Sequence, residues 1–206
     1  MRGALVVLEG IDQAGKMTQA RALQDAVRAG GLGCEVLHYP DYETRIGQLI
    51  RGFLLDGVAL DTHARAMLFA ANRWEKDAQV RAACERNALV CVDRYSASNI
   101  VYGLSQGIDE AWLQGLEAGL LPADLTVLVD IAPAESQRRK SQDRDDYERN
   151  VQLLEAARAR YVRMAERDQW AVVNGEREAA QVSKDLINAV SDRLQTRFPE
   201  LARLGR

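Results

Sequence analysis

The chain has 206 residues, and its 27 Lys and Arg side chains against 30 Asp and Glu side chains give a formal net charge of −3. Hydrophobic residues make up 47% of the sequence and charged residues 28%. This composition excludes wholesale disorder and provides enough apolar material for one domain over residues 1–206. The mildly acidic balance argues against a general nucleic-acid-binding protein.

The sequence predicts neither a membrane segment nor a cysteine-based metal site. The first apolar run, residues 4–8, ends at Glu9, and no later run approaches the roughly 18 to 20 residues that span a bilayer. We therefore expect no signal peptide, no transmembrane helix and no membrane partner. Cys34, Cys84 and Cys91 form an odd count without a Cys-x-x-Cys spacing. A reduced cytoplasmic protein without structural zinc is expected.

Short apolar runs alternate with longer amphipathic segments along the chain. The predicted order is a strand over residues 4–8, a helix from Lys16 to about Gly30, a strand over 34–39, helical spacing over 46–55 and about 62–86, a strand over 88–92, two helical stretches, a strand over 125–131, a helical face, a strand over 170–174 and a last helical face. Continuously apolar strands between helices predict an α/β fold, a doubly wound five-stranded parallel sheet with helices on both faces.

The segment after the first strand matches a phosphate-binding loop. It follows the pattern GxxxxGK[ST] at Gly10, Gly15 and Lys16, with Met17 in the Ser/Thr place. The residues expected to hold nucleotide phosphates are Gly10, Ile11, Asp12, Gln13, Ala14, Gly15, Lys16, Met17 and Thr18. An ordinary glycine-containing turn is the alternative. The strand before the loop and the helix after it favour phosphate binding, because backbone N–H groups converge at such a helix N-terminus.

Two further clusters suit a nucleotide site. Asp93-Arg94-Tyr95 ends the third strand. An aspartate in this place can bind the water shell of a phosphate-bound Mg²⁺, and Arg94 can donate two hydrogen bonds to a phosphate. Alone, the tripeptide is better explained as a surface ion pair; together with the phosphate loop, it favours a phosphate site. Phe69 and Arg73 share a helical face, which suits a ring stacked on a base and a guanidinium bonded to its carbonyl. A core phenylalanine beside a solvated arginine is the open alternative.

Together, these motifs resemble the thymidylate kinase family, P-loop nucleoside monophosphate kinases that phosphorylate dTMP. The resemblance runs from the first strand to about residue 165 and includes the spacing between motifs. The residues that carry it are Leu8 to Asp12 with Gly15-Lys16, Pro40-Asp41, Phe69 with Asn72-Arg73, Asp93-Arg94-Tyr95, Ser98-Asn99 with Tyr102, Leu121-Pro122 with Asp124, Asp130, and Asp146-Tyr147-Glu148-Arg149.

The resemblance implies roles for the matching residues. Lys16 and its loop would hold the ATP phosphates, and Arg94 would bind the dTMP phosphate. Asp12 would face the acceptor nucleotide and, with Asp93, the water shell of Mg²⁺. On the acceptor side, the expected residues are Phe69 stacked on thymine, Arg73 bonded to its O4, Asn99 at another polar edge of the base, Tyr102 against the sugar, and Tyr147.

A basic segment over residues 137–147 resembles the mobile lid that closes over ATP, with Arg138, Arg139 and Arg144 as its catalytic charges and Lys140 beside them. Three positions depart from the family pattern. Met17 lacks the hydroxyl that ligates the metal, Gln13 stands where some members carry an arginine, and Tyr42 stands where others place a phosphate-binding arginine. The lid arginines could replace the loop arginine, and Arg45 lies near Tyr42.

The sequence therefore predicts an ATP-dependent, Mg²⁺-requiring kinase that converts dTMP to dTDP. A homodimer is expected from the resemblance, with the Ala- and Leu-rich stretch over residues 64–71 as a possible face. Two rival interpretations stay open. One is a kinase of another nucleoside monophosphate, against which Asn99 and Tyr102 argue. The other is a non-catalytic nucleotide-binding protein in which Met17 marks lost metal chemistry.

Overall fold

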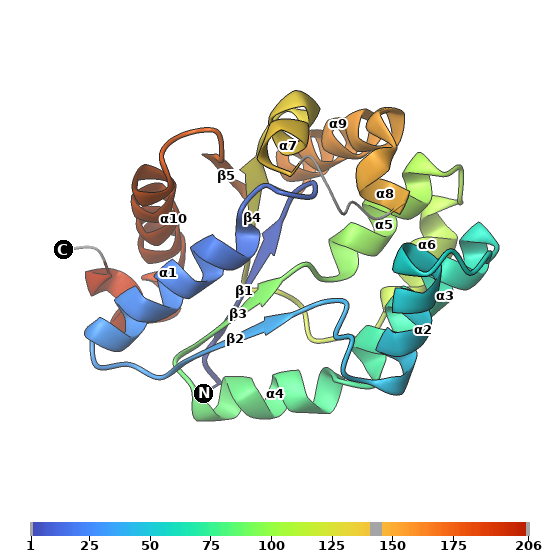
Figure 1. Cartoon of the computed structure of the whole chain (residues 1–206). Coiled ribbons are helices and arrows are strands. Elements are labelled where there is room, and N and C mark those ends of the chain that lie inside the picture. Colours follow the sequence, from blue (N-terminus) through green and yellow to red (C-terminus); the bar gives the residue numbers. More distant parts are fainter. Residues whose placement is uncertain (1, 141–145, 205–206) are drawn as a thin grey trace.

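The computed structural model describes residues 2–140 and 146–204, and its centre is one five-stranded parallel sheet (Figure 1). The strands lie in the order β2-β3-β1-β4-β5. Their bounds are β1 (Ala4–Glu9), β2 (Cys34–His38), β3 (Leu89–Asp93), β4 (Leu125–Asp130) and β5 (Ala171–Asn174). The predicted doubly wound α/β fold is confirmed, and each strand end lies within one residue of the predicted one.

Helices connect and cover these strands. They are α1 (Lys16–Ala29), α2 (Arg45–Leu55), α3 (Thr62–Trp74), α4 (Asp77–Arg86), α5 (Ser96–Ser105), α6 (Glu110–Glu117), α7 (Pro133–Arg139), α8 (Asp146–Arg149), α9 (Val151–Arg167) and α10 (Ala179–Leu194), followed by a 3₁₀ turn, η1 (Pro199–Arg203). In Figure 1, α1 and α10 cover one face of the sheet, and α2, α3, α5 and α6 gather beyond the strand ends.

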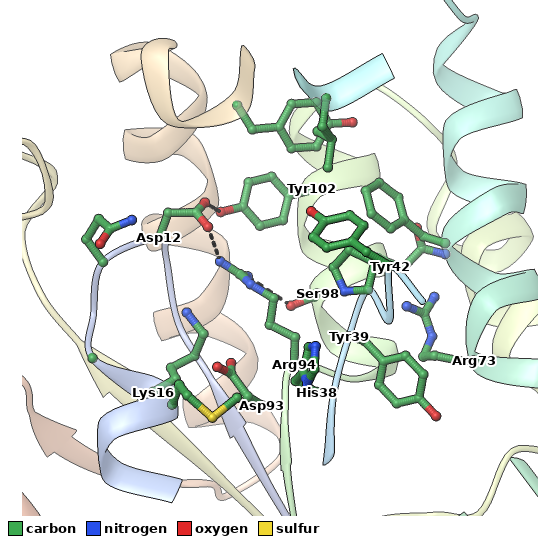
Figure 2. Close-up of a pocket in the computed structure, with 18 of the residues that line it drawn as sticks. Asp12, Lys16, His38, Tyr39, Tyr42, Arg73, Asp93, Arg94, Ser98 and Tyr102 are labelled. Atoms are coloured by element: carbon green, nitrogen blue, oxygen red, sulfur yellow. Dashed lines mark hydrogen bonds and ion pairs between the residues drawn. The ribbon is translucent and has the colours of Figure 1, made fainter. Parts of the chain in front are cut away.

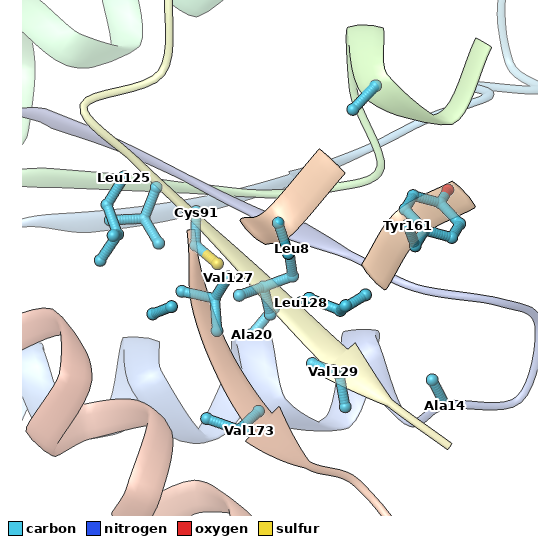
Figure 3. Packing of buried hydrophobic residues seen from close by; sticks show 14 of the residues in the cluster. Leu8, Ala14, Ala20, Cys91, Leu125, Val127, Leu128, Val129, Tyr161 and Val173 are labelled. Atoms are coloured by element: carbon cyan, nitrogen blue, oxygen red, sulfur yellow. The ribbon is translucent and has the colours of Figure 1, made fainter. Parts of the chain in front are cut away.

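The apolar run of β1 is explained by its central place. Every side chain of β1 is buried. Val7 packs in a cluster with Val80 of α4, whereas Val6 and Leu8 belong to the larger cluster that includes Leu23 of α1. Figure 3 shows Leu8 and Ala20 of α1 in this larger cluster. A parallel strand covered on both faces needs apolar side chains at successive positions rather than at alternate ones. The chain adds β2 and β3 on one side of β1 and then β4 and β5 on the other, which creates a switch point at the end of β1.

The helical spacing over residues 62–86 corresponds to two helices, α3 and α4, rather than one. Between them, Lys76 Nζ lies 2.6 Å from Asp41 Oδ2. The amide of Asn72 accepts from the backbone N–H of Asp41 at 2.8 Å and donates to its carbonyl oxygen at 3.3 Å. These contacts tie the break to the segment after β2. The periodicity of either helix could not reveal them, because they join residues far apart in the sequence.

Two sequence-based expectations concern the surroundings of the protein. No helix within residues 2–140 and 146–204 is both long and apolar enough to cross a membrane.

Cys34, Cys84 and Cys91 are free and buried. Burial raises the pKa of Cys34 to about 12 and raises the pKa of Cys84 and Cys91 as well. The three sulfurs are therefore protonated core groups near neutral pH.

Candidate active site

A pocket of about 440 Å³ lies beyond the carboxyl ends of β1, β2 and β3 (Figure 2). It brings together most of the residues predicted from the sequence. The phosphate loop contributes Asp12, Gln13, Gly15, Lys16, Met17 and Thr18 to its lining. The other predicted residues in the lining are Phe69, Arg73, Asp93, Arg94, Asn99, Tyr102 and Tyr147.

The phosphate loop has the backbone conformation that its glycines permit. Gly10 has φ 142° and Gly15 has φ 89°, and a Cβ on Gly10 would lie 2.5 Å from the carbonyl oxygen of Val129. Lys16 Nζ donates to the carbonyl oxygens of Gly10 (3.1 Å) and Ile11 (2.9 Å). The ammonium therefore lies inside the loop, beside the first N–H groups of α1, which have no intrahelical partner. This is a phosphate-binding arrangement.

An ion pair occupies the middle of the pocket. Arg94 Nη2 donates to Asp12 Oδ1 at 2.6 Å, and the Tyr102 hydroxyl donates to Asp12 Oδ2 at 2.8 Å. Burial alone raises the pKa of Asp12, but the charges of Arg94 and Lys16 outweigh burial and bring this pKa below its ordinary value. Asp12 is therefore ionised and holds the Arg94 guanidinium in the pocket.

Behind this pair lies the carboxylate of Glu9, which is fully buried at the end of β1. It accepts hydrogen bonds from the backbone N–H groups of Tyr95 (2.9 Å) and Ser98 (3.2 Å) and from the hydroxyls of Ser98 (2.6 Å) and Tyr161 (3.1 Å). Arg94 Nη1 donates to Ser98 Oγ at 3.1 Å. Glu9 thus fixes the turn in which Arg94 has φ 64°, a left-handed conformation uncommon outside glycine.

Aromatic rings form one wall of the pocket. The centroids of Tyr102 and Tyr147 are 5.4 Å apart at an interplanar angle of 20°, and Phe69 lies 6.4 Å from Tyr147. Phe53 supports Phe69 from behind, edge to face, at 5.5 Å. Such a wall can accept a flat base by stacking.

Next to the wall, a buried carboxylate joins the two polar side chains predicted to face a base. Arg73 Nε donates to Glu117 Oε2 at 2.8 Å, and its Nη2 donates to Oε1 of the same carboxylate. Asn99 Nδ2 donates to Glu117 Oε1 at 2.6 Å. Arg73 is only 2% exposed, so the alternative of a solvated arginine is wrong.

The segment expected to act as a lid contributes contacts to the phosphate loop. Arg139 Nη1 donates to the carbonyl oxygen of Gln13 at 3.2 Å, whereas the Arg138 side chain is 75% exposed and bonds Glu135. Gln13 Nε2 also donates to Glu148 at 2.5 Å. Of the two predicted lid arginines that the structure describes, Arg139 is thus the one that reaches the loop. Arg144, also predicted here, lies outside the described residues.

At the opposite end, Tyr42 lines the pocket together with His38. Arg45, which the sequence offered as a nearby positive charge that could help Arg94, is exposed and is not part of the pocket lining. Near the phosphate loop, the described cations of the pocket lining are therefore Lys16 and Arg94, and Arg139 contacts the loop from outside the lining.

Comparison with known proteins matches residues 8–186 to the thymidylate kinase family model. The chain belongs to the thymidylate kinase family. It is 33% identical over 194 residues to a thymidylate kinase of Arabidopsis thaliana, covering 94% of this chain and 73% of that protein. It is 30% identical over 197 residues to the human thymidylate kinase, covering 95% and 93%. The solved structure of the Candida albicans thymidylate kinase superposes with a TM-score of 0.81 at 27% identity, covering 93% and 92% of the two chains.

The two carboxylates that this thymidylate kinase family member was expected to use for Mg²⁺ differ in their surroundings. Asp93 Oδ1 is buried and has no hydrogen-bond partner among the described residues, so it fits a metal-bound water. Both oxygens of Asp12 are already engaged by Arg94 and Tyr102. No group of three or more His, Cys, Asp or Glu side chains in the described chain could hold a metal by itself. These residues fit a metal ion whose ligands are mainly nucleotide phosphate oxygens and water.

Sequence reasoning missed the roles of Glu9 and Glu117. Glu9 belongs to the run Leu8 to Asp12, which marks the family, but its four hydrogen bonds depend on how α5 and α9 pack. Glu117 ends the amphipathic helix α6, where a glutamate is ordinarily solvated. Only the fold brings it to Arg73, from which it is 44 residues away along the chain. No local signal distinguishes either carboxylate.

Replacing Ser98 tests the hydrogen-bond network around Glu9. Ser98→Ala removes the hydroxyl that donates to Glu9 and accepts from Arg94, and we expect it to lower the free energy of unfolding by about 1 to 3 kcal/mol. The control is Ser105→Ala on the same helix, whose hydroxyl only donates to Val101 O; its expected loss is below about 0.5 kcal/mol. Urea unfolding measures both. Equal losses would contradict the network.

Proposed function

We propose that the protein transfers the γ-phosphoryl group of ATP to dTMP, giving dTDP and ADP. The observation that supports this most directly is the placement of Lys16 and Arg94 in one pocket, with the aromatic wall of Phe69, Tyr102 and Tyr147 beside them. Membership of the thymidylate kinase family supports the same reaction.

In this reaction an oxygen of the dTMP phosphate forms a bond to the γ-phosphorus as the bond to the β,γ-bridging oxygen breaks. The acceptor oxygen is ionised near neutral pH, so the protein needs no general base. Its contribution is alignment and charge neutralisation. Lys16 and the loop N–H groups would hold the donor phosphates, Arg94 would bind the acceptor phosphate, and Arg139 would neutralise charge between them.

Asp12 would have to share or release Arg94 when the dTMP phosphate arrives. The pair at 2.6 Å keeps the guanidinium in place, and a phosphate with two negative charges is the stronger partner. The freed Asp12 carboxylate would then lie near the phosphates and help Asp93 hold the water shell of Mg²⁺. When bound, this ion would neutralise β- and γ-phosphate charge.

A kinase assay tests the proposed function. With ATP and Mg²⁺, dTMP should be converted with a kcat/KM at least about a hundredfold above those for AMP, GMP and CMP. Turnover of another monophosphate at the same efficiency would favour the first rival, a kinase of different specificity. No turnover of any monophosphate would favour the second, a nucleotide-binding protein without activity.

The two neighbouring lid arginines provide a matched comparison. Arg139→Ala should lower kcat by about a hundredfold, because it removes a charge that reaches the phosphate loop. Arg138→Ala should change kcat by less than about threefold, since its side chain is exposed and, although both arginines pair with Glu135, only Arg139 bonds the phosphate loop. Steady-state kinetics at saturating ATP and dTMP measure both. A larger loss for Arg138→Ala would reverse the assignment of the lid charges.

Met17 predicts an unusual dependence on Mg²⁺. A thioether is too soft to ligate this hard cation, and one residue along a helix turns the Thr18 side chain by about 100°, away from the metal. We expect Met17→Ser to lower the Mg²⁺ concentration for half-maximal rate by about tenfold or less, with little change in kcat at saturating Mg²⁺. A wild type that is inert at saturating Mg²⁺, together with an active Met17→Ser variant, would contradict this and favour a degenerate nucleotide-binding protein.

We further propose a homodimer and a reducing, cytoplasmic location. The dimer is supported by large apolar side chains exposed on adjacent helices, Leu49 (59%) and Leu55 (52%) of α2 and Met67 (47%) of α3, which is also the region of the predicted 64–71 face. Isolated exposed hydrophobic side chains are common, but three of them on two helices that pack together favour an interface. The location is supported by three buried, unpaired cysteines.

A further inference from the structure

Glu117 contacts both polar side chains of the proposed base site. It lies at the end of α6, and its carboxylate meets Arg73 of α3 and Asn99 of α5. The exposed fractions of the three residues are 8%, 2% and 5%. A carboxylate that is nine-tenths buried and bonded to two pocket-lining side chains can set how those side chains present themselves to a ligand.

Asn99 can have only one amide orientation in these surroundings. Its Nδ2 donates to the carbonyl oxygen of Ala66 at 3.1 Å and to Glu117 Oε1 at 2.6 Å. Both neighbours only accept hydrogen bonds, so the amide nitrogen must face them and both of its hydrogens are used. Asn99 Oδ1, which accepts no hydrogen bond among the described residues, is the group left to the pocket. Asn99 therefore offers a ligand an acceptor.

Arg73 is oriented by the same carboxylate. Nε and Nη2 donate to the two oxygens of Glu117, and within the described part of the chain Nη1 has no hydrogen bond. The pocket-lining position of Arg73 gives that nitrogen to a ligand. Arg73 therefore offers a donor beside the Asn99 acceptor.

We propose that Glu117 is a specificity-determining positioning residue, which sets the polarity of the base site as one acceptor next to one donor. This inference rests on the proposed function. Thymine and uracil present N3–H and O4, which complement that pair, whereas cytosine presents N3 and N4–H₂, the reverse pattern on a ring of the same size. Guanine shares the thymine pattern but has two rings. Cytosine is therefore the nucleobase that polarity alone should exclude.

A carboxylate is required because three donor groups end on it, from Arg73 Nε, Arg73 Nη2 and Asn99 Nδ2. A glutamine of the same shape has one acceptor oxygen and one NH₂ group. One of these donors would then face the NH₂ group, so Arg73 must shift or the Asn99 amide must turn over. Either change weakens the acceptor-and-donor pattern.

Glu117→Gln tests this with titration calorimetry of dTMP, dUMP and dCMP. We expect the Kd for dTMP to rise about tenfold and the preference for dTMP over dCMP to fall by at least about tenfold, with ATP affinity unchanged. Glu110→Gln, on the same helix and paired with exposed Arg167, is the control and should keep the wild-type preference. The ratio of two Kd values is independent of the fraction of folded protein. A preference in Glu117→Gln within twofold of wild type would overturn the proposal.

Glu117→Asp separates polarity from packing. The aspartate keeps the charge and both acceptor oxygens but loses a methylene. If polarity sets the preference for dTMP over dCMP, this preference should stay within about threefold of wild type. If packing alone sets it, the preference should fall further in Glu117→Asp than in the isosteric Glu117→Gln. If the glutamine variant does not fold, the aspartate variant decides: a lost preference overturns the proposal. If wild type turns over dTMP and the two variants either both keep or both lose the preference for dTMP over dCMP, the role of Glu117 is wrong but the proposed function stands. Wild type without dTMP turnover removes the proposed function and this inference with it.

Discussion

The site depends on one buried carboxylate, Glu9, at the end of the central strand. Burial raises the pKa of Glu9 above its ordinary value. Hydrogen bonds from Ser98, Tyr95 and Tyr161 and the charge of Arg94 oppose this rise, because they stabilise the ionised carboxylate. Two of the donors are backbone N–H groups around the start of α5, which a helix cannot satisfy itself. β1, the Asp93-Arg94 turn and α9 are therefore joined at a point directly behind the pocket.

From this point the pocket is organised as pairs of opposite charge. Asp12 pairs with Arg94 and Glu117 pairs with Arg73, and both arginines line the pocket. Buried pairs of this kind add little to stability on balance, because desolvation offsets their attraction. Their use is positional. Each arginine is held where an anionic or polar ligand would contact it, so binding costs less side-chain conformational entropy.

The sequence was sufficient where the signal is local. The apolar runs, the glycine spacing of the phosphate loop and the Asp93-Arg94-Tyr95 cluster predicted the sheet and three strand ends that line the pocket. It was insufficient where distant segments meet. The break between α3 and α4 depends on Asn72 reaching the segment after β2, and Glu117 looks like any glutamate on an amphipathic helix. Arg138 and Arg139 are adjacent and chemically identical, and the contacts that distinguish them are the bonds of Arg139 to the carbonyl oxygens of Gln13 and Gly175, which only the fold brings near.

The central claim is that Arg94, held by Asp12 and the Glu9 network, is the receptor for a nucleotide phosphate. Titration calorimetry of dTMP against thymidine tests it most directly, because the two ligands differ only in that phosphate. The account predicts that dTMP binds at least about a hundredfold more tightly, as expected for two charge-assisted hydrogen bonds in a partly buried site. Equal affinities for the two ligands would contradict it.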